Sequence, residues 1–332
     1  MNAQGAVPSA TILVIAYRMR DTIAEAVASA LAQLPAEGGN GFEIIVSDDS
    51  SGDGTLEAAQ AAVAGHAGPH RVMVRSTARN LGLCPHLSEL ATLATGEVLV
   101  CLAGDDIAYP QRTQRLLAAF AANPHAQIVG SQVDDIDARG AIIERNVRGV
   151  PGRIDQRWLL HHGKLAAVLG ASMAIRRTLL TQFPPLQGKV EDNMLTLRAV
   201  LAGDCLCLPE ALLGYRRHDS NLGDWVFDRS GKDYAAYERR NRRVLAMYRE
   251  IADDQARCVA ARPDLPEDRR RLGQALSDMY ALEAEMREAV LDKPRAQWLS
   301  PLWRGIRHPG LRRKSLERAF KLLLPRRLFG RG

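Results

Sequence analysis

The sequence predicts an α/β protein with a mostly parallel central sheet flanked by helices, followed by a helical extension toward the carboxyl terminus. Residues 11–130 alternate between short apolar runs and helical patterns, which is typical of βαβ units. Near Asn221 the pattern changes to long, charged helical stretches. With 332 residues, 46% hydrophobic and 5% aromatic, the chain can form one large domain with an aliphatic core plus an extension.

Short apolar runs predict the first four strands of the sheet. The expected strands are residues 11–16, 42–46, 71–74 and 97–102. Asp21 is a candidate cap for a helix after the first strand. The apolar positions of that helix recur at spacings of four, four and three, at Ile23, Val27, Leu31 and Leu34. A further helix is expected from Pro110, because proline is tolerated at the first helical position.

Shorter elements are expected in the next part of the chain. The predicted strands are residues 128–134, 141–143, 171–175 and 205–208, and the predicted helices are residues 156–164, 176–181 and 191–201. Two longer helices are expected at residues 233–258 and 267–291. Because Pro263 and Pro266 interrupt the helical pattern, these two helices are predicted to pack as a hairpin. The chain would then consist of an α/β domain at 1–222, a helical hairpin at 223–295 and a basic segment at 296–332.

Charge is distributed unevenly along the chain. Residues 296–332 hold ten Lys or Arg against one acid, a net charge of +9, whereas the whole chain carries +6. The first 295 residues are therefore acidic, at −3. An acidic body with a basic end indicates one contact with an anionic surface rather than nucleic-acid binding, and no nucleic-acid recognition motif is present.

Cysteine spacing and hydropathy bear on location. The five cysteines form no C-x-x-C pair and no zinc or disulfide pattern. The apolar run at residues 11–16 is too short for a signal-peptide core, and the run at 165–175 is too short to span a bilayer. We therefore expect a cytoplasmic protein with no transmembrane segment.

Pairs of carboxylates follow two of the predicted strands. Asp48 and Asp49 come after the second strand, in EIIVSDDSSGDGT, and Asp105 and Asp106 come after the fourth, in VLVCLAGDD. Ligands of open α/β sheets bind beyond the carboxyl ends of strands, where carboxylates can hold Mg²⁺ or Mn²⁺ against a diphosphate. The alternatives are that the first pair caps the helix beginning near Thr55 and that the second is an ordinary acidic turn.

Over about residues 11–221 the chain resembles the family 2 glycosyltransferases, which share the Rossmann-like GT-A fold. Four stretches carry the resemblance, in order: TILVIAYRMRDTI, EIIVSDDSSGDGT, NLGLCPHLSELATLATGEVLVCLAGDD, and VEDNMLTLRAVLAG with LGYRRHDSN behind it. The resemblance implies the GT-A fold and transfer of a sugar from a nucleotide-diphosphate donor. UDP is favoured because it is the commonest nucleotide in that family.

The resemblance assigns the nucleotide to the edge formed by the first two strands. Asp49, with Asp48 beside it, would contact the base and ribose. Ala16 and Tyr17 would flank the same nucleotide through main-chain contacts. The stretch after the N-x-G sequence departs from the family, because Leu87 and Ser88 stand where arginine and asparagine are often found.

The metal-binding DXD motif of the family aligns with Ala103, Gly104 and Asp105, followed by Asp106. Alanine replaces the first aspartate, which usually contacts the ribose. Asp105 remains as the principal ligand expected for Mn²⁺ or Mg²⁺, with Asp106 beside it. His218 would complete the metal or diphosphate site, since neutral imidazole is an acceptable Mn²⁺ ligand, although a structural role is the alternative for a loop histidine.

An ED pair at the start of a helix carries the general base in this family, and it corresponds to Glu191 and Asp192, with Asp192 as the base. The base would remove the proton from an acceptor hydroxyl as that hydroxyl attacks the anomeric carbon. The alternative is that both acids only favour the amino terminus of their helix through its macrodipole.

Arg216 or Arg217 would meet phosphate oxygens in bidentate geometry.

Basic residues alternate with leucines and aromatic residues between Trp298 and Phe329. This composition is typical of a helix that lies on an anionic membrane, where each basic residue contributes about 1 kcal/mol. The alternative is a disordered basic tail.

These features predict a metal-dependent, inverting glycosyltransferase of the bacterial cell-surface polysaccharide type. It would move a sugar from a nucleotide sugar to a hydroxyl of a lipid-linked or membrane-associated glycan, as a peripheral enzyme on the inner face of the plasma membrane. A dinucleotide-dependent oxidoreductase or a methyltransferase is disfavoured, because YRMRDT after the first strand lacks glycine. A catalytically inert, glycosyltransferase-like scaffold at the membrane remains as the alternative, suggested by Ala103.

Overall fold

The computed structural model describes residues 9–35, 39–147, 151–163, 165–218, 233–325 and 329. The chain divides into two compact units. The first comprises Met1–Ile154 and Ala167–His218, and the second comprises Asp155–Ala166 and Asp219–Gly332. The predicted boundary at residue 222 lies outside the described residues.

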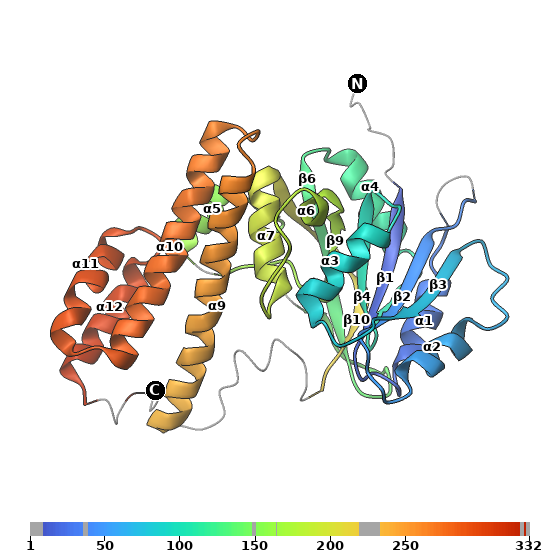
Figure 1. Ribbon diagram of the computed structural model, residues 1–332, viewed down its shortest axis with the longest axis horizontal. Coiled ribbons are helices and arrows are strands. Elements are labelled where there is room, and N and C mark those ends of the chain that lie inside the picture. Colours follow the sequence, from blue (N-terminus) through green and yellow to red (C-terminus); the bar gives the residue numbers. More distant parts are fainter. Residues whose placement is uncertain are drawn as a thin grey trace. The chain divides into compact units, whose positions relative to one another are not determined.

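A ten-stranded sheet organises the first unit, in the order β3-β2-β1-β4-β9-β6-β10-β5, with β7 beside β6 and β8 beside β10 (Figure 1). Its parallel part consists of β3 (Arg71–Ser76), β2 (Glu43–Asp48), β1 (Ala10–Ala16) and β4 (Val98–Ala103). Ala16 pairs with Asp48, and Ile15 with Ala103, so three strands end at one edge. The predicted mostly parallel sheet and its first four strands are confirmed.

The rest of the sheet mixes strand directions. Its strands are β5 (Ile107–Ala108), β6 (Ala126–Ile136), β7 (Ile142–Val147), β8 (Arg153–Ile154), β9 (Ala174–Arg176) and β10 (Asp204–Arg216). β9 runs antiparallel to both β4 and β6 and joins the two halves. β10 is longer than predicted, because its register with β6 shifts between Leu208 and Ala211 and the strand resumes beyond Pro209.

Helices cover both faces of this sheet. The helices of the first unit are α1 (Ile23–Leu31), α2 (Thr55–Val63), α3 (Leu83–Leu93), α4 (Arg112–Ala122), α6 (Thr178–Thr181) and α7 (Glu191–Ala202), with a 3-10 turn, η1, at Gly170–Ser172. α1, α2 and α4 share one apolar core with Ile12 and Val14 of β1. Leu13, between them, is equally buried. Burial on both faces explains why the sequence shows continuous apolar runs here instead of alternation.

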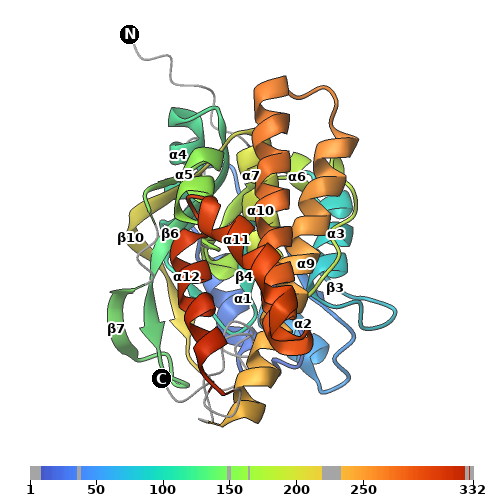
Figure 2. The ribbon, with the colours of Figure 1, turned by 90° about the vertical axis from the view of Figure 1, so that its left-hand side faces the viewer.

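The second unit is helical. α9 (Tyr234–Ala261) and α10 (Glu267–Asp292) form the predicted hairpin, and Asp233 caps α9 by accepting a hydrogen bond from the Ala236 N–H at 2.8 Å. α10 also packs against α5 (Gln156–His162) and α11 (Leu299–Arg307) (Figure 2). The remaining elements are η2 (Arg295–Trp298), α12 (Arg312–Phe320) and η3 (Lys321–Leu323). None of the described helices is long and apolar enough to cross a bilayer.

The structure divides the chain differently from the predicted boundaries. The predicted helix at residues 156–164 belongs to the second unit, and the described part of the basic segment folds within that unit. The Nη1 and Nη2 atoms of Arg318 donate to the two carboxylate oxygens of Glu283, at 2.8 and 2.6 Å, and Glu283 is fully buried. Because a buried carboxylate needs its partner, this pair fixes α12 to α10. The disordered-tail alternative is therefore wrong for residues 299–323.

Candidate active site

The candidate site lies at the carboxyl-terminal edge of β1, β2 and β4. β1 pairs in parallel with both β2 and β4, so the acidic pair after β2 and the acidic pair after β4 flank the end of β1. This edge is where ligands of open α/β sheets bind.

Asp49 ties the end of β2 to a segment that lies 28 to 33 residues later in the chain. Its carboxylate accepts hydrogen bonds from the Thr77 hydroxyl at 3.1 Å and from the N–H groups of Leu81 and Gly82 at 2.9 and 2.8 Å. Its own N–H donates to the carbonyl of Ala16 at 2.8 Å. Asp49 thus fixes the loop ahead of α3 against the end of β1.

Asp48 shapes the tight turn that follows β2. It accepts hydrogen bonds from the Ser51 hydroxyl, from the Ser51 N–H at 3.0 Å and from the Ser76 hydroxyl at 3.0 Å. A carboxylate offers about four acceptor positions, so each of these two aspartates retains roughly one for a ligand. Neither caps the following helix, because Asp53 accepts from the Thr55 N–H. The capping alternative is therefore wrong for both.

Tyr17 is the accessible side chain at the end of β1. It is 41% exposed, and the Arg18 guanidinium lies 5.2 Å from its ring centre. Arg18 and Ser50 adopt positive φ angles of 56° and 57°, which are uncommon for residues other than glycine. The Arg18 N–H donates to the Ser51 hydroxyl at 2.7 Å, and this hydrogen bond joins the turn after β1 to the turn after β2. Tyr17 directly follows Ala16, whose carbonyl accepts the Asp49 N–H.

Asp105 meets His218 just beyond the end of β4. The Nε2 atom of His218 lies 2.7 Å from Oδ2 of Asp105, across 113 residues of sequence. The loop is held on its other side by the Thr22 hydroxyl at the start of α1, which donates to the Gly104 carbonyl at 3.0 Å. Two residues predicted as metal ligands are therefore brought together.

The donor set at this position fits a hard divalent cation. Asp105 offers a carboxylate and His218 an imidazole, and the Oδ2 atom of Asp106 is buried with no hydrogen-bond partner among the described residues. Within the same residues no three His, Cys, Asp or Glu side chains form a complete metal site. Mg²⁺ and Mn²⁺ are usually held by one or two protein ligands together with substrate phosphates and water, so this partial set is compatible with them.

Asp106 differs from its neighbour in having an almost fully buried side chain. Its Oδ1 accepts the Arg216 N–H at 2.9 Å, which anchors the end of β10 to the loop after β4. Burial, followed by the nearby Asp105 charge, raises the pKa of Asp106 well above its usual range, although the Arg216 N–H opposes this. Its predicted role as a metal ligand stays a prediction that rests on Oδ2.

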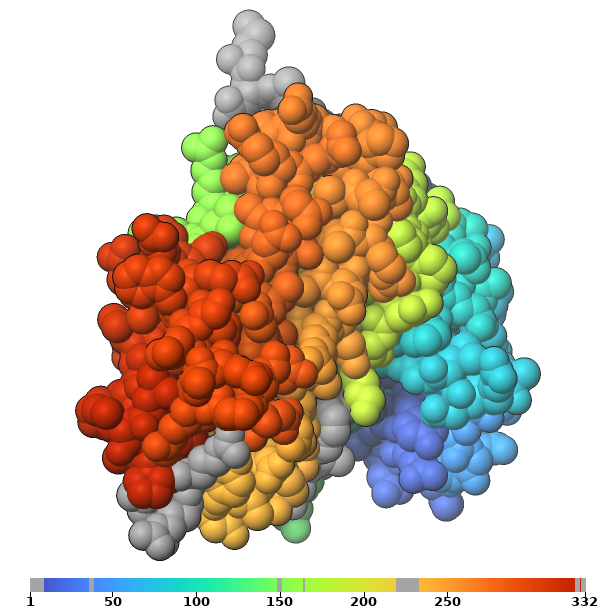
Figure 3. All heavy atoms as spheres, turned by 60° about the vertical axis from the view of Figure 1, so that its left-hand side comes forward, coloured from blue at the N-terminus to red at the C-terminus, as the bar shows by residue number. Residues whose placement is uncertain are grey.

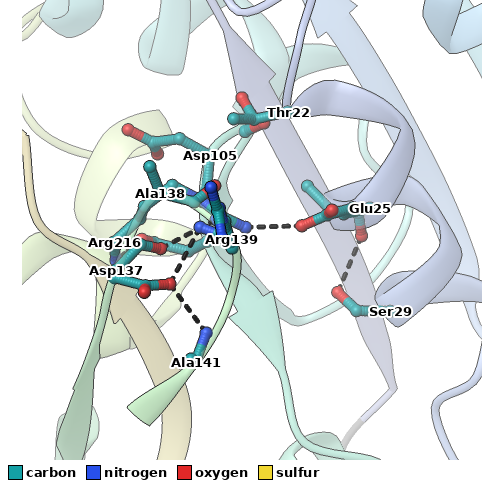
Figure 4. A network of polar contacts seen from close by, with 12 residues as sticks. Thr22, Glu25, Ser29, Asp105, Asp137, Ala138, Arg139, Ala141 and Arg216 are labelled. Atoms are coloured by element: carbon teal, nitrogen blue, oxygen red, sulfur yellow. Dashed lines mark hydrogen bonds and ion pairs between the residues drawn. The ribbon is translucent and has the colours of Figure 1, made fainter. Parts of the chain in front are cut away.

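Arg216 does not present its guanidinium to a ligand, so its predicted phosphate contact is wrong. The side chain is 2% exposed and donates to the carbonyl oxygens of Asp105 at 2.7 Å, Asp137 at 3.0 Å and Ala138 at 2.8 Å, and to the Glu25 carboxylate. Figure 4 shows these groups converging from α1, from the loop after β4 and from the turn after β6. Arg216 therefore supports the main chain behind Asp105 instead of meeting phosphate oxygens.

Glu191 and Asp192 begin α7. Burial, and then the Asp192 charge, raises the pKa of Glu191 to about 8, and burial raises the pKa of Asp192 to about 6. The N–H and side-chain amide of Asn193 donate to Asp192 at 2.6 and 2.9 Å, which favours its ionised form. At neutral pH Glu191 is then mostly protonated and Asp192 mostly ionised, and this separation suits an acid–base role.

Gly170 makes room for this acidic pair. A Cβ atom at Gly170 would lie 2.1 Å from Oε1 of Glu191, so a larger residue there would require the Glu191 carboxyl group to move. The carbonyl of Ala171 is bonded by the buried guanidinium of Arg112, which also bonds the Cys101 carbonyl on β4. The turn η1 thus connects the start of α7 to β4, the strand that leads to Asp105.

Several supporting residues escaped the sequence analysis. Thr22 donates to the carbonyl of Gly104. Thr77, Gly170 and Asn193 lie against the side-chain carboxyl groups of Asp49, Glu191 and Asp192, and none of these four residues belongs to a motif. The N-x-G stretch that ends at Gly82 was a usable signal, because glycine there leaves main-chain N–H groups accessible to a carboxylate.

Comparisons with known proteins agree with this geometry. The family model described as Glycosyl transferase family 2 matches residues 11–183. A Bacillus subtilis (strain 168) protein, EpsE, described as a glycosyltransferase, is 30% identical over 139 residues. That match covers 41% of this chain and 48% of EpsE, so the chain spans about half the length of this curated relative.

Solved structures share the fold at low sequence identity. S. aureus TarS 1–349 in complex with UDP-GlcNAc is 18% identical, with a TM-score of 0.54, covering 92% of this chain and 82% of that one. The mannosyltransferase PcManGT from Pyrobaculum calidifontis, in complex with GDP-Man and Mn²⁺, is 17% identical, with a TM-score of 0.51, covering 96% and 87%. These similarities establish the fold of the chain.

Proposed function

The chain belongs to glycosyl transferase family 2, and from that premise we propose that it transfers a sugar from a nucleotide-diphosphate donor to a hydroxyl acceptor with inversion. The observation that carries the proposal is the meeting of His218 and Asp105 at the end of β4, in the same unit as the acid pair of Glu191 and Asp192. A UDP-sugar is the proposed donor. TarS, which shares the fold, was solved with UDP-GlcNAc.

The nucleotide end of the donor would be bound at β1 and β2. The exposed ring of Tyr17 offers a stacking surface for the base, and the remaining acceptor positions of Asp48 and Asp49 can take hydrogen bonds from the base and ribose. Ala16 contributes indirectly, since its carbonyl holds the Asp49 N–H. Ala103 provides no carboxylate, so the ribose contact usual at that position is absent.

The diphosphate would lie beside Asp105 and His218, which would hold Mn²⁺ or Mg²⁺. A cation bound there would neutralise the charge of the departing diphosphate. The Asp105 main chain is fixed by Arg216, so the carboxylate is positioned before the donor binds.

Asp192 is the proposed general base. As the acceptor oxygen bonds to the anomeric carbon, the bond from that carbon to the diphosphate oxygen breaks, and the hydroxyl proton passes to Asp192. One displacement of this kind converts an α-linked donor sugar to a β-linked product. Protonated Glu191 beside Asp192 adds no second negative charge, so the basic form of Asp192 is retained at neutral pH.

The acceptor is proposed to be a lipid-linked or membrane-associated glycan of cell-surface polysaccharide biosynthesis, with the enzyme cytoplasmic and peripheral at the membrane. The rival is an inert scaffold that binds no donor productively, which Ala103 favours.

Release of nucleoside diphosphate from UDP-, GDP- and dTDP-sugars, with Mn²⁺ or with a chelator, tests the transferase proposal. Metal-dependent turnover of one donor, lost in Asp105→Asn and Asp192→Asn, is the expected result. If no donor binds or turns over, even with an acceptor extract and Mn²⁺, the scaffold function replaces it.

A further inference from the structure

We infer that α11, α12 and η3 form a preassembled docking surface for an anionic lipid bilayer. The inference is independent of the transferase activity, because it rests on the second unit alone.

Exposed apolar side chains of the second unit are concentrated in one short stretch. Every large hydrophobic side chain of this unit that is strongly exposed, among the residues the structure describes, lies between residues 299 and 323. These are Leu299, Trp303, Leu316, Phe320 and Leu323, each more than half exposed. The described parts of α9 and α10 are more than twice as long and expose none. A soluble surface rarely collects apolar side chains in this way without a partner.

Basic side chains accompany these apolar ones on the same helices. Residues 295–325 contain eight Lys or Arg and one acid. Arg307 lies 5.5 Å from the ring centre of Trp303, and Arg312 donates to the Ile306 carbonyl. In the described part of the chain neither has a carboxylate partner within ion-pair distance. An apolar surface bordered by cationic groups is complementary to an anionic interface, where tryptophan and phenylalanine enter the headgroup region.

The surface is already folded and does not need a membrane to form. Trp298, Leu302 and Leu311 are buried, and a Cβ atom at Gly305 would lie 2.2 Å from the Ser315 hydroxyl, which shows how closely α11 and α12 approach. Arg318 fixes α12 to the buried Glu283. The buried side of each helix faces the unit, and the outer atoms of this region are open to view in Figure 3. Docking therefore costs little ordering entropy.

A bilayer fits this surface better than a second copy of the chain. Two copies joined here would bring Arg307 and Arg312 of each copy together, and neither of these has a carboxylate partner in the described part of the chain. Such a contact is opposed by like-charge repulsion, whereas anionic headgroups attract the same residues.

Vesicle flotation of the full chain tests the inference. The probes are phosphatidylcholine vesicles and vesicles of phosphatidylcholine mixed with phosphatidylglycerol. Binding is expected only to the mixed vesicles and should weaken with salt. Arg307→Glu with Arg312→Glu should reduce binding about twentyfold or more, since each basic residue contributes about fivefold. Trp303→Ser with Phe320→Ser should reduce it about tenfold or more.

Matched controls keep the test specific. Arg239→Glu with Arg271→Glu changes two exposed arginines of α9 and α10, and Met73→Ser with Leu93→Ser removes two exposed apolar side chains of the first unit. The apolar control pair should bind as the wild type does, and the charge control pair should lose far less than the Arg307 and Arg312 pair. Circular dichroism confirms folding, and the charge reversals remain informative if the serine variants do not fold.

Three results would overturn the inference: equal binding to neutral vesicles, equal losses in the control and test variants, or no vesicle binding together with a dimer that the Trp303 and Phe320 changes dissociate. The last would assign the surface to self-association, as measured by light scattering.

Discussion

Two acidic pairs lie at the ends of β2 and β4, the parallel strands on either side of β1, yet the structure uses them differently. Asp48 and Asp49 both bond to nearby loops, and each accepts three hydrogen bonds from its own chain. In the second pair the two carboxylates diverge, because Asp105 meets His218 while Asp106 is buried against the Arg216 N–H. An acidic pair at a strand end therefore indicates the location of a site, and its partners determine which carboxylate is available to a ligand.

A third pair, Glu191 and Asp192, extends this comparison. Burial raises both pKa values, the Asp192 charge raises that of Glu191 further, and the Asn193 hydrogen bonds oppose the rise at Asp192. Asp192→Asn should lower kcat by about 10²- to 10⁴-fold, the usual contribution of a general base, while donor binding is retained. Glu191→Gln is the matched control and should cost less than about tenfold, because the amide resembles the protonated acid. The rate of nucleoside diphosphate release distinguishes the two variants. Equal losses of kcat in both would contradict the assignment of Asp192 as the base.

The roles of Asp105 and Asp106 can be distinguished by replacing each of them with asparagine. Asp105→Asn should reduce metal-dependent turnover by about a hundredfold or more and raise the Mn²⁺ concentration needed for half-maximal rate. Asp106→Asn should affect the Mn²⁺ requirement less, because its carboxyl is buried and bonded to Arg216. A larger shift in Mn²⁺ requirement for Asp106→Asn would show that Oδ2 of Asp106 is the main ligand.

Arg216 connects the Asp105 loop to α1 and to the turn after β6. Arg216→Lys should destabilise the protein by about 2–4 kcal/mol, because lysine cannot reproduce the branched contacts of a buried guanidinium and leaves carbonyl groups unpaired. It should also raise the Mn²⁺ requirement. Arg217→Lys is the control. It changes a half-buried residue whose ion-pair distance to Asp135 is long, at 3.5 Å, so it should change the unfolding midpoint little. Urea unfolding of both variants measures these changes. Equal midpoints for Arg216→Lys and Arg217→Lys would contradict the structural role of Arg216.

Asp49 tests whether the first pair supports loops. Asp49→Asn should cost about 1–3 kcal/mol, because one partly buried N–H group, of Leu81 or Gly82, would face an amide nitrogen instead of a carboxylate oxygen. Asp21→Asn, at an exposed position, should leave the urea midpoint unchanged. If Asp49→Asn weakens nucleotide binding without changing stability, its main role is in ligand contact and not in holding the loop.

The smallest expected effect concerns pH. Protonation inactivates a general base, so kcat/KM should fall as the pH drops through about 6, the pKa of Asp192. Asn193→Ala removes a hydrogen bond to the ionised carboxylate, which raises the pKa, so the acid limb should move to higher pH by a fraction of a unit. An unchanged acid limb in Asn193→Ala would assign that titration to another group.

Local patterns were sufficient for much of the fold. The apolar runs of β1 to β4, the hairpin of α9 and α10, and the positions of the acidic pairs follow from short-range periodicity and motif order. The contacts of Arg216 could not be predicted from local patterns. Its partners include Glu25 and Asp137, which are distant in sequence and come close only in the folded chain. Likewise Glu283 sits within an ordinary helical pattern, and nothing local shows that Arg318 pairs with it and orders the basic segment.

The central claim is that Asp105 and Asp192 have different roles in one reaction: Asp105 holds the metal ion beside the diphosphate, and Asp192 removes the proton from the acceptor. It is tested most directly by the affinity for nucleoside diphosphate, measured with and without Mn²⁺ for the wild type, Asp105→Asn and Asp192→Asn. Mn²⁺ should strengthen binding in the wild type and in Asp192→Asn, and it should have little effect in Asp105→Asn. If Mn²⁺ strengthens binding in Asp105→Asn as well, or fails to do so in Asp192→Asn, the division of roles is contradicted.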